Sequence, residues 1–398
     1  MSPHVFLVAG EESGDRLGAA LIAAIKRRHV DAHFSGVGGT HMAAAGLQSL
    51  FPLGDLAIMG FGAIPGSLPK ILRRIHETAD AVVVAGPDVF VIIDSPEFTH
   101  RVARRVRAIA PEIPIVDYVC PSVWAWRPGR ARAMRSYVDH VLALLPFEPA
   151  AMQKLGGPPC TFVGHPLSEQ VATLRPNAEE ARRRLGEPPI LLVMPGSRAG
   201  EIQRMAGIFG AAAGLVSDRI GGLQAVVPAV PRLAERMREA VKSWPVPVRV
   251  VTAPDEKASA FRTARAALAK SGTSTLELAV AGVPMVAAYR ISLLEELIAH
   301  LMIKVPSIIL ANLILGEKAV PELVQRACTP EKLAAALMPL MSDTPERRRQ
   351  IEAFARLDST MEMGKVVPSD RAAAVILDCA AALNQQKRET VASVPTTA

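Results

Sequence analysis

Two loops in the second half of the chain combine small residues with hydrogen-bond donors just before a helical pattern. The first, MPGSRAGEI at 194–202, follows the apolar run PILLV. It places Arg198 directly after Gly196 and Ser197, and Glu201 falls in the first helical turn. Unpaired backbone N–H groups at a helix start attract anions, so this loop predicts a phosphate contact with Arg198. The alternative is an exposed turn in which Arg198 pairs with Glu201 and stabilises little.

The second loop, KSGTSTLE at 270–277, lies between a predicted strand and a predicted helix. Ser271, Gly272 and Thr273 offer backbone and hydroxyl donors to a pyrophosphate, and Glu277 offers an acceptor for ribose hydroxyls. Ser274 and Glu277 also have the spacing of a capping box, which would occupy Glu277 structurally. Both interpretations stay open. Two such loops, each at the carboxyl end of a strand, together predict a nucleotide diphosphate site.

The first half of the chain offers carboxylates and a histidine near strand ends. Asp94 in VIIDSPEF comes just past a strand, where it can act as a general base on a hydroxyl. The alternative, which the residue type favours, is a cap for the helix that follows, and Asp15 in EESGD has the same two interpretations. His165 in VGHPL is a candidate for binding a phosphate or sugar hydroxyl, the alternative being a structural histidine.

The sequence contains no D-x-D, no P-loop and no His, Cys and carboxylate cluster at metal-ligand spacing. The charge of a departing diphosphate is then expected to be met by helix N-termini and Arg198, without a metal or another cofactor. The four cysteines are far apart and form no CxxC pair, so we expect buried free thiols: Cys120, Cys160, Cys328 and Cys379.

The segment LAIMGFGAIPGSLPKILRR at 56–74 mixes apolar residues, Gly, Pro and cations. This mixture suits a segment that dips into an anionic bilayer or holds acyl chains. The alternative is an ordinary core helix with a solvated basic end. The residues concerned are Leu56, Ile58, Met59, Phe61, Ile64, Leu68, Lys70, Arg73 and Arg74.

These loops must be positioned by elements that alternate between short apolar runs and helical periods. VFLVAG at 5–10 and DVFVIID at 88–94 each lead into a helical pattern, and IPIVDYV and HVLALLPF follow. The same rhythm restarts after about residue 187 with PPILLVMPGS. Such alternation predicts parallel βαβ units, and therefore two doubly wound α/β domains in tandem. Ligands of such sheets bind where the carboxyl ends of the strands face a crevice.

Composition and charge limit the classes of molecule that the protein is expected to bind. The chain has 398 residues, half of them apolar, and a net charge of +7 whose surplus is concentrated between residues 73 and 136. A basic patch attracts nucleic acid, an anionic membrane or a phosphorylated substrate, but no nucleic-acid module can be read and aromatic residues are scarce. The apolar start is too short for a secretory signal, and His300, Lys304 and Pro306 interrupt the most membrane-like run, 297–315.

Eight motifs occur in an order that resembles the lipid-A-disaccharide synthases, over about residues 5 to 380. They are AGEESGD, GVGGTHM, DSPEF, YVCPSVWAWR, VGHPL, MPGSRAGEI, KSGTSTLE and ANLILGEKAVPELVQ. The resemblance implies a GT-B fold, in which two Rossmann-like, doubly wound parallel-sheet domains face a central cleft. It also implies an inverting, metal-independent transfer from UDP-2,3-diacylglucosamine to 2,3-diacylglucosamine 1-phosphate. The products would be the β-1,6 lipid A disaccharide 1-phosphate and UDP.

The resemblance also implies where the domains lie. We expect an acceptor- and membrane-binding domain at 1–168 and a UDP-sugar-binding domain at 169–345. C-terminal helices at 346–384 are expected to pack back on the first domain, followed by a flexible tail at 385–398. The family implies a peripheral enzyme on the cytoplasmic face of a Gram-negative inner membrane, and we expect a homodimer and no nucleic acid.

Residue roles carry over by motif. Asp94 would take the proton from the acceptor's 6-hydroxyl. The donor side would comprise Gly196, Ser197, Arg198, Glu201, Ser271, Gly272, Thr273, Glu277, Asn312, Glu322 and Gln325. The acceptor side and the first loop would comprise Ser13, Asp15, Trp124, Trp126, Arg127 and His165. Arg127 and Arg130 are both candidates to bind the acceptor phosphate.

Two other functions remain open from the residues alone. A UDP-sugar 2-epimerase shares the two-domain architecture and the nucleotide loops, but it would need no acyl-binding surface. A peripheral module that binds lipid and nucleotide without catalysis is the second alternative. Acceptor-dependent release of UDP separates both from the transferase.

Overall fold

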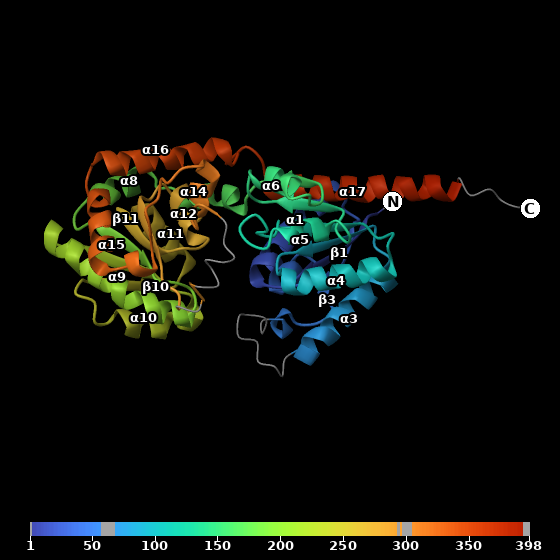
Figure 1. The fold of residues 1–398 in the computed structure, drawn as a ribbon, viewed down its shortest axis with the longest axis horizontal. Coiled ribbons are helices and arrows are strands. Elements are labelled where there is room, and N and C mark those ends of the chain that lie inside the picture. Colours follow the sequence, from blue (N-terminus) through green and yellow to red (C-terminus); the bar gives the residue numbers. More distant parts are fainter. Residues whose placement is uncertain (1, 57–67, 293–294, 297–304, 393–398) are drawn as a thin grey trace, which may run out of the picture. The chain divides into compact units, whose positions relative to one another are not determined.

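The chain folds into two α/β units in a computed structural model that describes residues 2–56, 68–292, 295–296 and 305–392 (Figure 1). One unit comprises Met1–Pro166 with Val366–Ala398, and the other comprises Leu167–Lys365. Each unit is built on a single parallel sheet, as the alternation of apolar runs and helical periods predicts. The doubly wound α/β architecture is thereby confirmed.

The first unit contains a seven-stranded sheet in the order β3-β2-β1-β4-β5-β6-β7. Its strands are β1 His4–Ala9, β2 His33–Val37, β3 Gln48–Ser49, β4 Val89–Ile93, β5 Ile115–Tyr118, β6 His140–Ala143 and β7 Cys160–Phe162. Its helices are α1 Glu12–Arg28, α2 Thr40–Ala44, α3 Leu68–Ala85, α4 Pro96–Ile109, α5 Gly129–Met134, α6 Glu148–Lys154 and α17 Pro368–Ala392.

Strand β4 shows why the first sheet is covered on both faces. All five of its residues, VFVII, are buried, as expected for a parallel strand between two helical layers. Phe90 and Ile92 pack into a core with residues of α3 and α4. Val91 and Ile93 pack on the opposite face into a core that includes residues of α1 and α17.

The second unit contains a six-stranded sheet in the order β10-β9-β8-β11-β12-β13. Its strands are β8 Ile190–Met194, β9 Gln224–Pro228, β10 Val248–Val251, β11 Ala266–Lys270, β12 Met285–Tyr289 and β13 Glu322–Val324. Its helices are α7 Val171–Leu174, α8 Ala178–Leu185, α9 Ala199–Ile220, α10 Ala234–Val241, α11 Pro254–Thr263, α12 Ser274–Val280, α14 Leu310–Leu315, α15 Pro330–Leu337 and α16 Pro345–Thr360.

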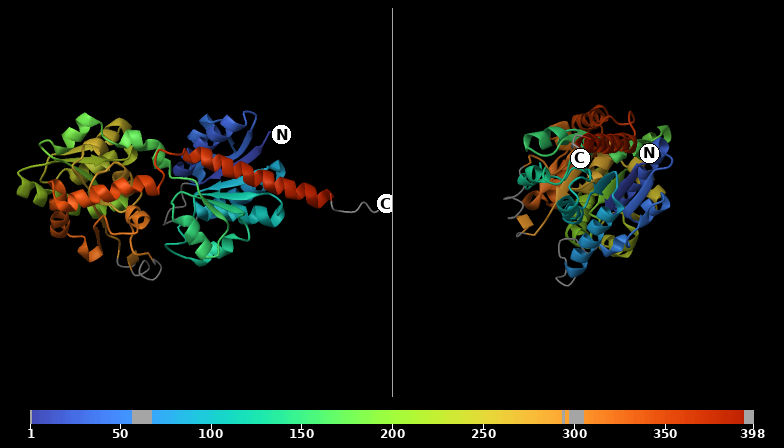
Figure 2. Two further views of the ribbon diagram at one scale, coloured as in Figure 1. Left: turned by 90° about the horizontal axis from the view of Figure 1, so that it is seen from above. Right: turned by 90° about the vertical axis from the view of Figure 1, so that its right-hand side faces the viewer.

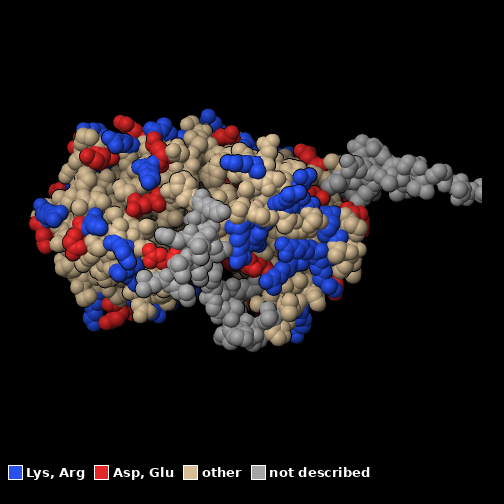
Figure 3. Space-filling view, viewed as in Figure 1, with Lys and Arg blue, Asp and Glu red and all other residues tan. Residues whose placement is uncertain are grey.

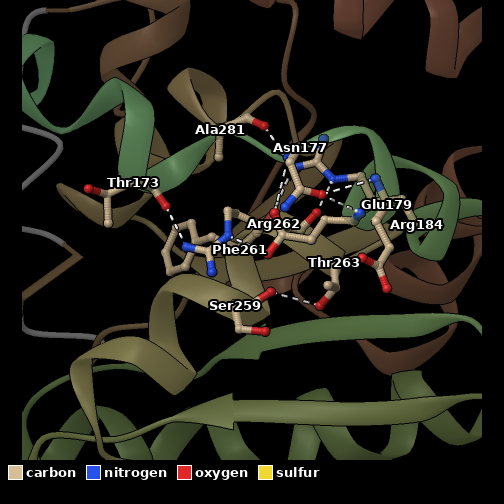
Figure 4. Close-up of polar contacts among 10 residues, drawn as sticks. Thr173, Asn177, Glu179, Arg184, Ser259, Phe261, Arg262, Thr263 and Ala281 are labelled. Atoms are coloured by element: carbon tan, nitrogen blue, oxygen red, sulfur yellow. Dashed lines mark hydrogen bonds and ion pairs between the residues drawn. The ribbon is translucent and has the colours of Figure 1, made fainter.

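Arg184, at the end of α8, forms hydrogen bonds with the ends of two other helices of the second unit (Figure 4). Its guanidinium donates to the carbonyl oxygens of Phe261 and Arg262, near the end of α11, at 2.9 and 2.8 Å. It also donates to the carbonyls of Ala281 and Gly282, just past α12, at 2.8 and 3.1 Å. The last carbonyls of a helix have no partner within the helix, so one arginine here satisfies two helix ends.

The C-terminal helices divide between the two units. Helix α17 packs against α1, and Ala373 and Ile376 join the core of the first unit (Figure 2). Helix α16 instead packs against α12 and α14 in the second unit. The helix α17 also continues to Ala392, past residue 384 where the sequence predicts a tail, because NQQKRETVA consists largely of helix-compatible residues. Within the described residues, no helix has both the length and the apolar character needed to span a bilayer.

Candidate active site

A cavity of about 310 Å³ lies in the second unit where β8 and β11 end. Its lining brings together both predicted anion loops, as expected for neighbouring parallel strands whose carboxyl ends meet at one edge of the sheet. The polar and glycine positions of the lining are Gly196, Ser197, Arg198, Glu201, Lys257, Lys270, Gly272, Thr273 and Ser274.

The side chain of Glu201, in the first turn of α9, forms hydrogen bonds with the turn that precedes this helix. Glu201 Oε2 accepts hydrogen bonds from the backbone N–H groups of Ser197 and Arg198, at 3.0 and 3.2 Å. Gly196 has φ of +137°, and a Cβ there would lie 2.4 Å from Cβ of Glu201, so the turn requires glycine. A buried carboxylate therefore occupies N–H groups that the sequence assigns to an incoming anion.

Arg198 is the exposed member of this loop. Its side chain is 81% exposed, and its Nη1 lies 3.9 Å from Glu201 Oε1. That distance is at the limit of an ion pair, and such exposed pairs contribute little to stability. The guanidinium is accordingly positioned at the cavity without a strong partner holding it.

Two lysines that the sequence analysis missed supply most of the remaining positive charge. Lys270 Nζ lies 3.1 Å from Glu201 Oε1 and 4.6 Å from the ring centre of Tyr289. Lys257 Nζ, from α11, lies 3.6 Å from Glu277 Oε2. Lys270 directly precedes the SGT motif, which is the one signal that would have found it. Lys257 is distant in sequence and gives no such signal.

Lys270 also sets the charge of Glu201. Burial alone would raise the pKa of the Glu201 carboxyl, but the hydrogen bond from Lys270 and those from the two backbone N–H groups bring it below its ordinary value. Glu201 is therefore ionised at neutral pH. The cavity thus contains a fixed anion with cations on either side of it.

The second loop forms without a capping box. Thr273 occupies the N-cap position of α12 with helical backbone angles and no side-chain hydrogen bond to the helix. Within the described part of the chain, Glu277 Oε2 has no hydrogen-bond partner. The capping interpretation of Ser274 and Glu277 is therefore wrong. Glu277 retains acceptor capacity next to Lys257.

Three residues predicted for the donor site form hydrogen bonds outside the cavity lining: Asn312, Glu322 and Gln325. Asn312 Nδ2 donates to Glu322 Oε1 at 2.8 Å, and Glu322 Oε2 accepts from the backbone N–H of Ile308 at 3.1 Å. The carbonyl of Ile308 in turn accepts from Ser271 Oγ at 3.2 Å. Gln325 binds the backbone of residue 291. The first pair thus positions Ser271, and through it the second loop.

A second cavity, of about 230 Å³, lies in the first unit beyond β4 and β5. Asp94 lines it, as do two residues of the PSVWAWR motif and its surroundings, Trp126 and Arg130. The full lining is Asp94, Pro96, His100, Asp117, Val119, Cys120, Pro121, Ser122, Val123, Trp126 and Arg130.

Asp94 is fixed by a strained turn. Asp94 and Ser95 have φ of 55° and 47°, in the left-handed region that non-glycine residues rarely adopt. Asp94 Oδ1 accepts from the backbone N–H of Ser95 at 2.8 Å, and Oδ2 accepts from Ser13 Oγ at 2.9 Å. Ser95 occupies the N-cap position of α4, so the capping interpretation of Asp94 is wrong.

The aromatic motif separates into buried and cavity-facing parts. Trp124 Nε1 donates to Glu148 Oε1 at 3.1 Å, and Trp124 is not part of the cavity lining. Burial raises the pKa of Glu148 to about 7. Trp126 lines the cavity, and the exposed guanidinium of Arg127 lies 4.6 Å from its ring centre. Of the two arginine candidates for the acceptor phosphate, Arg130 lines the cavity.

The surroundings of Asp15 and His165 favour the structural interpretation of both residues. The Asp15 carboxylate is buried and accepts from the backbone N–H groups of Gly39, His41 and Met42, at the start of α2. It therefore stabilises the end of a helix other than its own. Burial lowers the pKa of His165 to about 4, so its imidazole is neutral at pH 7.

The segment 56–74 is only partly described. Ile58, Met59, Phe61 and Ile64 lie outside the described residues. Leu56 is buried in the core, and Leu68 is the first residue of α3. Arg73 is exposed. Asp55 accepts from both Arg74 Nε, at 3.1 Å, and Lys70 Nζ, at 2.7 Å.

Basic side chains gather on the first unit over α4 and α5 (Figure 3). The basic patch, as defined here, consists of the exposed arginines Arg101, Arg104, Arg127, Arg132 and Arg135. Across the ranges that the structure describes, no three His, Cys, Asp or Glu side chains come together as a metal-binding group.

Comparison with known proteins agrees on one family. A family model described as "Lipid-A-disaccharide synthetase" matches residues 5–374. The lipid-A-disaccharide synthase of Nitrobacter hamburgensis is 58% identical over 378 residues, which is 95% of this chain and 96% of the relative.

Solved structures are similar in fold alone. Acinetobacter baumannii MurG aligns with a TM-score of 0.58 at 15% identity, covering 94% of this chain and 99% of that one. The S. aureus MnaA–UDP co-structure aligns with a TM-score of 0.61 at 11% identity, covering 94% and 95%. With the two parallel-sheet units, these similarities identify the GT-B fold.

Proposed function

The chain belongs to the lipid-A-disaccharide synthase family, and from that premise we propose how its two cavities divide one glycosyl transfer. The enzyme is a glycosyltransferase that joins 2,3-diacylglucosamine from its UDP donor to 2,3-diacylglucosamine 1-phosphate. The products are the β-1,6 lipid A disaccharide 1-phosphate and UDP.

The cavity in the second unit binds the donor diphosphate. The observation that supports this most directly is the arrangement of Lys257, Lys270 and Arg198 around the start of α9. Three cations and one carboxylate leave the lining with a positive balance that suits a diphosphate. Glu277, with acceptor capacity left over, accepts hydrogen bonds from ribose hydroxyls.

Asp94 acts as the general base. Its carboxylate takes the proton of the acceptor's 6-hydroxyl as the oxygen attacks the anomeric carbon of the donor sugar. The bond from that carbon to the diphosphate oxygen breaks, and its electron pair leaves with UDP. A single displacement inverts the anomeric carbon, so an α-linked donor gives the β-linked product. The hydrogen bond from Ser13 holds the carboxylate in place.

Charge on the leaving diphosphate is met by protein groups. Three cations oppose the negative charge that develops on the leaving oxygen, which is the role a metal has in other transferases: Lys257, Lys270 and Arg198. We therefore propose that transfer needs no metal. Arg130, in the lining of the first cavity, binds the acceptor's 1-phosphate.

The basic patch gives the enzyme its membrane surface. Both substrates are acylated and anionic, so they reside in a bilayer, and exposed arginines attract anionic headgroups. The patch and the segment 56–74 together hold the first unit at the inner face of the inner membrane.

The donor assignment is tested by titrating UDP into the protein with excess chelator. Saturable binding that is weakened by about tenfold or more in Lys270→Met and kept in the exposed-lysine variant Lys242→Met supports it. Binding that is equal in all three proteins would contradict it.

A further inference from the structure

The cavity beside Asp94 contains a buried acid–imidazole pair that the mechanism above does not use. Asp117 is 1% exposed and His100 is 3% exposed, and His100 Nε2 lies 3.2 Å from Asp117 Oδ2. Both residues line the cavity. Among the described residues, Asp117 Oδ2 has no hydrogen-bond partner of good geometry. A buried carboxylate oxygen without a well-aligned donor is costly, so a further donor from a ligand in this cavity would stabilise Asp117.

The strand register places Asp117 next to Asp94. Asp117 in β5 pairs with Ile92 in β4, and Asp94 follows Ile92 by two residues. Asp94 belongs to the turn that follows β4, and both carboxylates line the same cavity. Strand spacing and rise separate their Cα atoms by about 8 Å. This is close enough for both to contact one sugar ring.

A chain of hydrogen bonds fixes the imidazole behind Asp117. Arg104 Nη2 donates to the hydroxyl of Tyr137 at 3.2 Å, and this hydroxyl lies 3.1 Å from His100 Nδ1. With Nδ1 engaged there, Nε2 is left to face Asp117. Asp117, on the other side of the imidazole from Tyr137, is one of the residues that line the cavity.

Charges around the pair act on Asp117 in both directions. Burial raises the pKa of the Asp117 carboxyl, and the nearby charge of Asp94 adds to this rise. His100 and Arg130 act in the opposite direction by favouring the ionised form. The pair with His100 compensates part of the cost of burying a carboxylate.

The acceptor's chemistry supplies a matching donor. In 2,3-diacylglucosamine 1-phosphate, positions 1, 2 and 3 are substituted, which leaves hydroxyls at carbons 4 and 6. Both are nucleophiles, and a β-1,6 product requires the enzyme to choose between them. Resting on the proposed function, we propose that Asp117, positioned by His100, accepts a hydrogen bond from the 4-hydroxyl. The 6-hydroxyl alone then faces Asp94.

The test compares the natural acceptor with its 4-deoxy analogue in two proteins, wild type and Asp117→Leu. In wild type the analogue should lower kcat/KM by about tenfold or more, because it leaves the carboxylate without its donor. In Asp117→Leu the two acceptors should differ by less than about threefold, and some product should carry a 1,4 linkage. Val123→Ala, a change elsewhere in the same lining, should keep the wild-type discrimination.

Each outcome decides one claim. Wild-type protein that does not distinguish the two acceptors overturns the inference without any variant, so a misfolded Asp117→Leu protein leaves the test standing. Asp117→Leu protein that binds UDP normally and still discriminates as wild type does also overturns it. Wild-type protein that releases no UDP with the natural acceptor contradicts the proposed function instead.

Discussion

Asp94 and Ser95 are consecutive non-glycine residues in the left-handed region, and each such conformation costs about 1–3 kcal/mol. Strain of this kind is retained where a side chain must be held in one direction. Here the turn directs the Asp94 carboxylate to Ser13 and to the N–H of Ser95. The geometry therefore agrees with a positioned base, although the residue type alone favours a helix cap.

Asp94→Asn should lower kcat by about 10²- to 10⁴-fold, because the amide cannot take the proton of the attacking hydroxyl. The affinity for UDP should stay within twofold, since Asp94 lies in the other unit. Steady-state kinetics and UDP calorimetry check both parts. Glu112→Gln, an exposed carboxylate elsewhere in the same unit, serves as the control. A near-normal kcat for Asp94→Asn would contradict the role.

Lys270→Met should weaken UDP binding by about tenfold or more, because it removes a cation and leaves Glu201 uncompensated. Lys270→Arg should recover much of the loss. Calorimetry at low and high salt measures the effect, and the loss should shrink as salt screens the charge. An unchanged dissociation constant in Lys270→Met would show that the diphosphate binds elsewhere.

For individual residues, the sequence predicts those that belong to a local motif and misses those that only the fold brings together. Gly196, Ser197 and Arg198 were predictable because small residues before a helix form a local pattern. The occupation of their N–H groups by Glu201 was not, because it depends on how that side chain folds back over the turn. Asp117 and His100 were missed because strand register and helix packing bring them together.

Helix ends in the second unit depend on one side chain of α8. Arg184 joins the ends of α11 and α12 through four carbonyl oxygens (Figure 4). Burial lowers the pKa of Arg184 to about 10, so it remains charged at neutral pH. A charged donor in this position is expected to be strong.

Arg184→Met should lower the free energy of unfolding of the second unit by about 2–4 kcal/mol, because four partly buried carbonyls lose a charged donor. Urea unfolding followed by circular dichroism measures this change. Arg182→Met, an exposed arginine of the same helix, should change stability by less than about 0.5 kcal/mol. Equal stabilities of the two variants would remove Arg184 from this role.

The strand and helix order was predictable from the alternation of apolar runs and helical periods, and it produced the correct fold class. The assignment of C-terminal helices to units was harder. Helices α16 and α17 both contain apolar positions on one face, and only the packing partners decide that α16 joins the second unit and α17 the first. Sequence pattern reports which face is apolar and not what covers it.

Charge across the whole molecule is uneven, and we propose that the basic patch binds an anionic membrane surface. Arg132→Glu with Arg135→Glu should reduce sedimentation with vesicles containing anionic lipid, because each basic residue near the surface contributes about 1 kcal/mol. Arg236→Glu with Arg238→Glu, exposed arginines of the second unit, is the matched control. If both double variants bind vesicles as wild type does, the basic patch is not the membrane surface.

His165 gives the stability of the protein a pH dependence. Its pKa is about 4 when folded and 6.5 ordinarily, so between these values the unfolded chain binds a proton that the folded chain does not. The contribution of His165 to the free energy of unfolding is therefore fully present above pH 6.5. It is lost progressively as the pH falls from 6.5 toward 4. In His165→Gln the melting temperature should fall less steeply over this range. Parallel pH profiles of the two proteins would contradict the assignment.

The central claim is tested most directly by measuring UDP release from UDP-2,3-diacylglucosamine in detergent with excess chelator, with and without 2,3-diacylglucosamine 1-phosphate. The account predicts release that depends on the acceptor, survives chelation and yields a β-1,6-linked disaccharide. Release that is independent of the acceptor, or that stops when divalent ions are chelated, would contradict it.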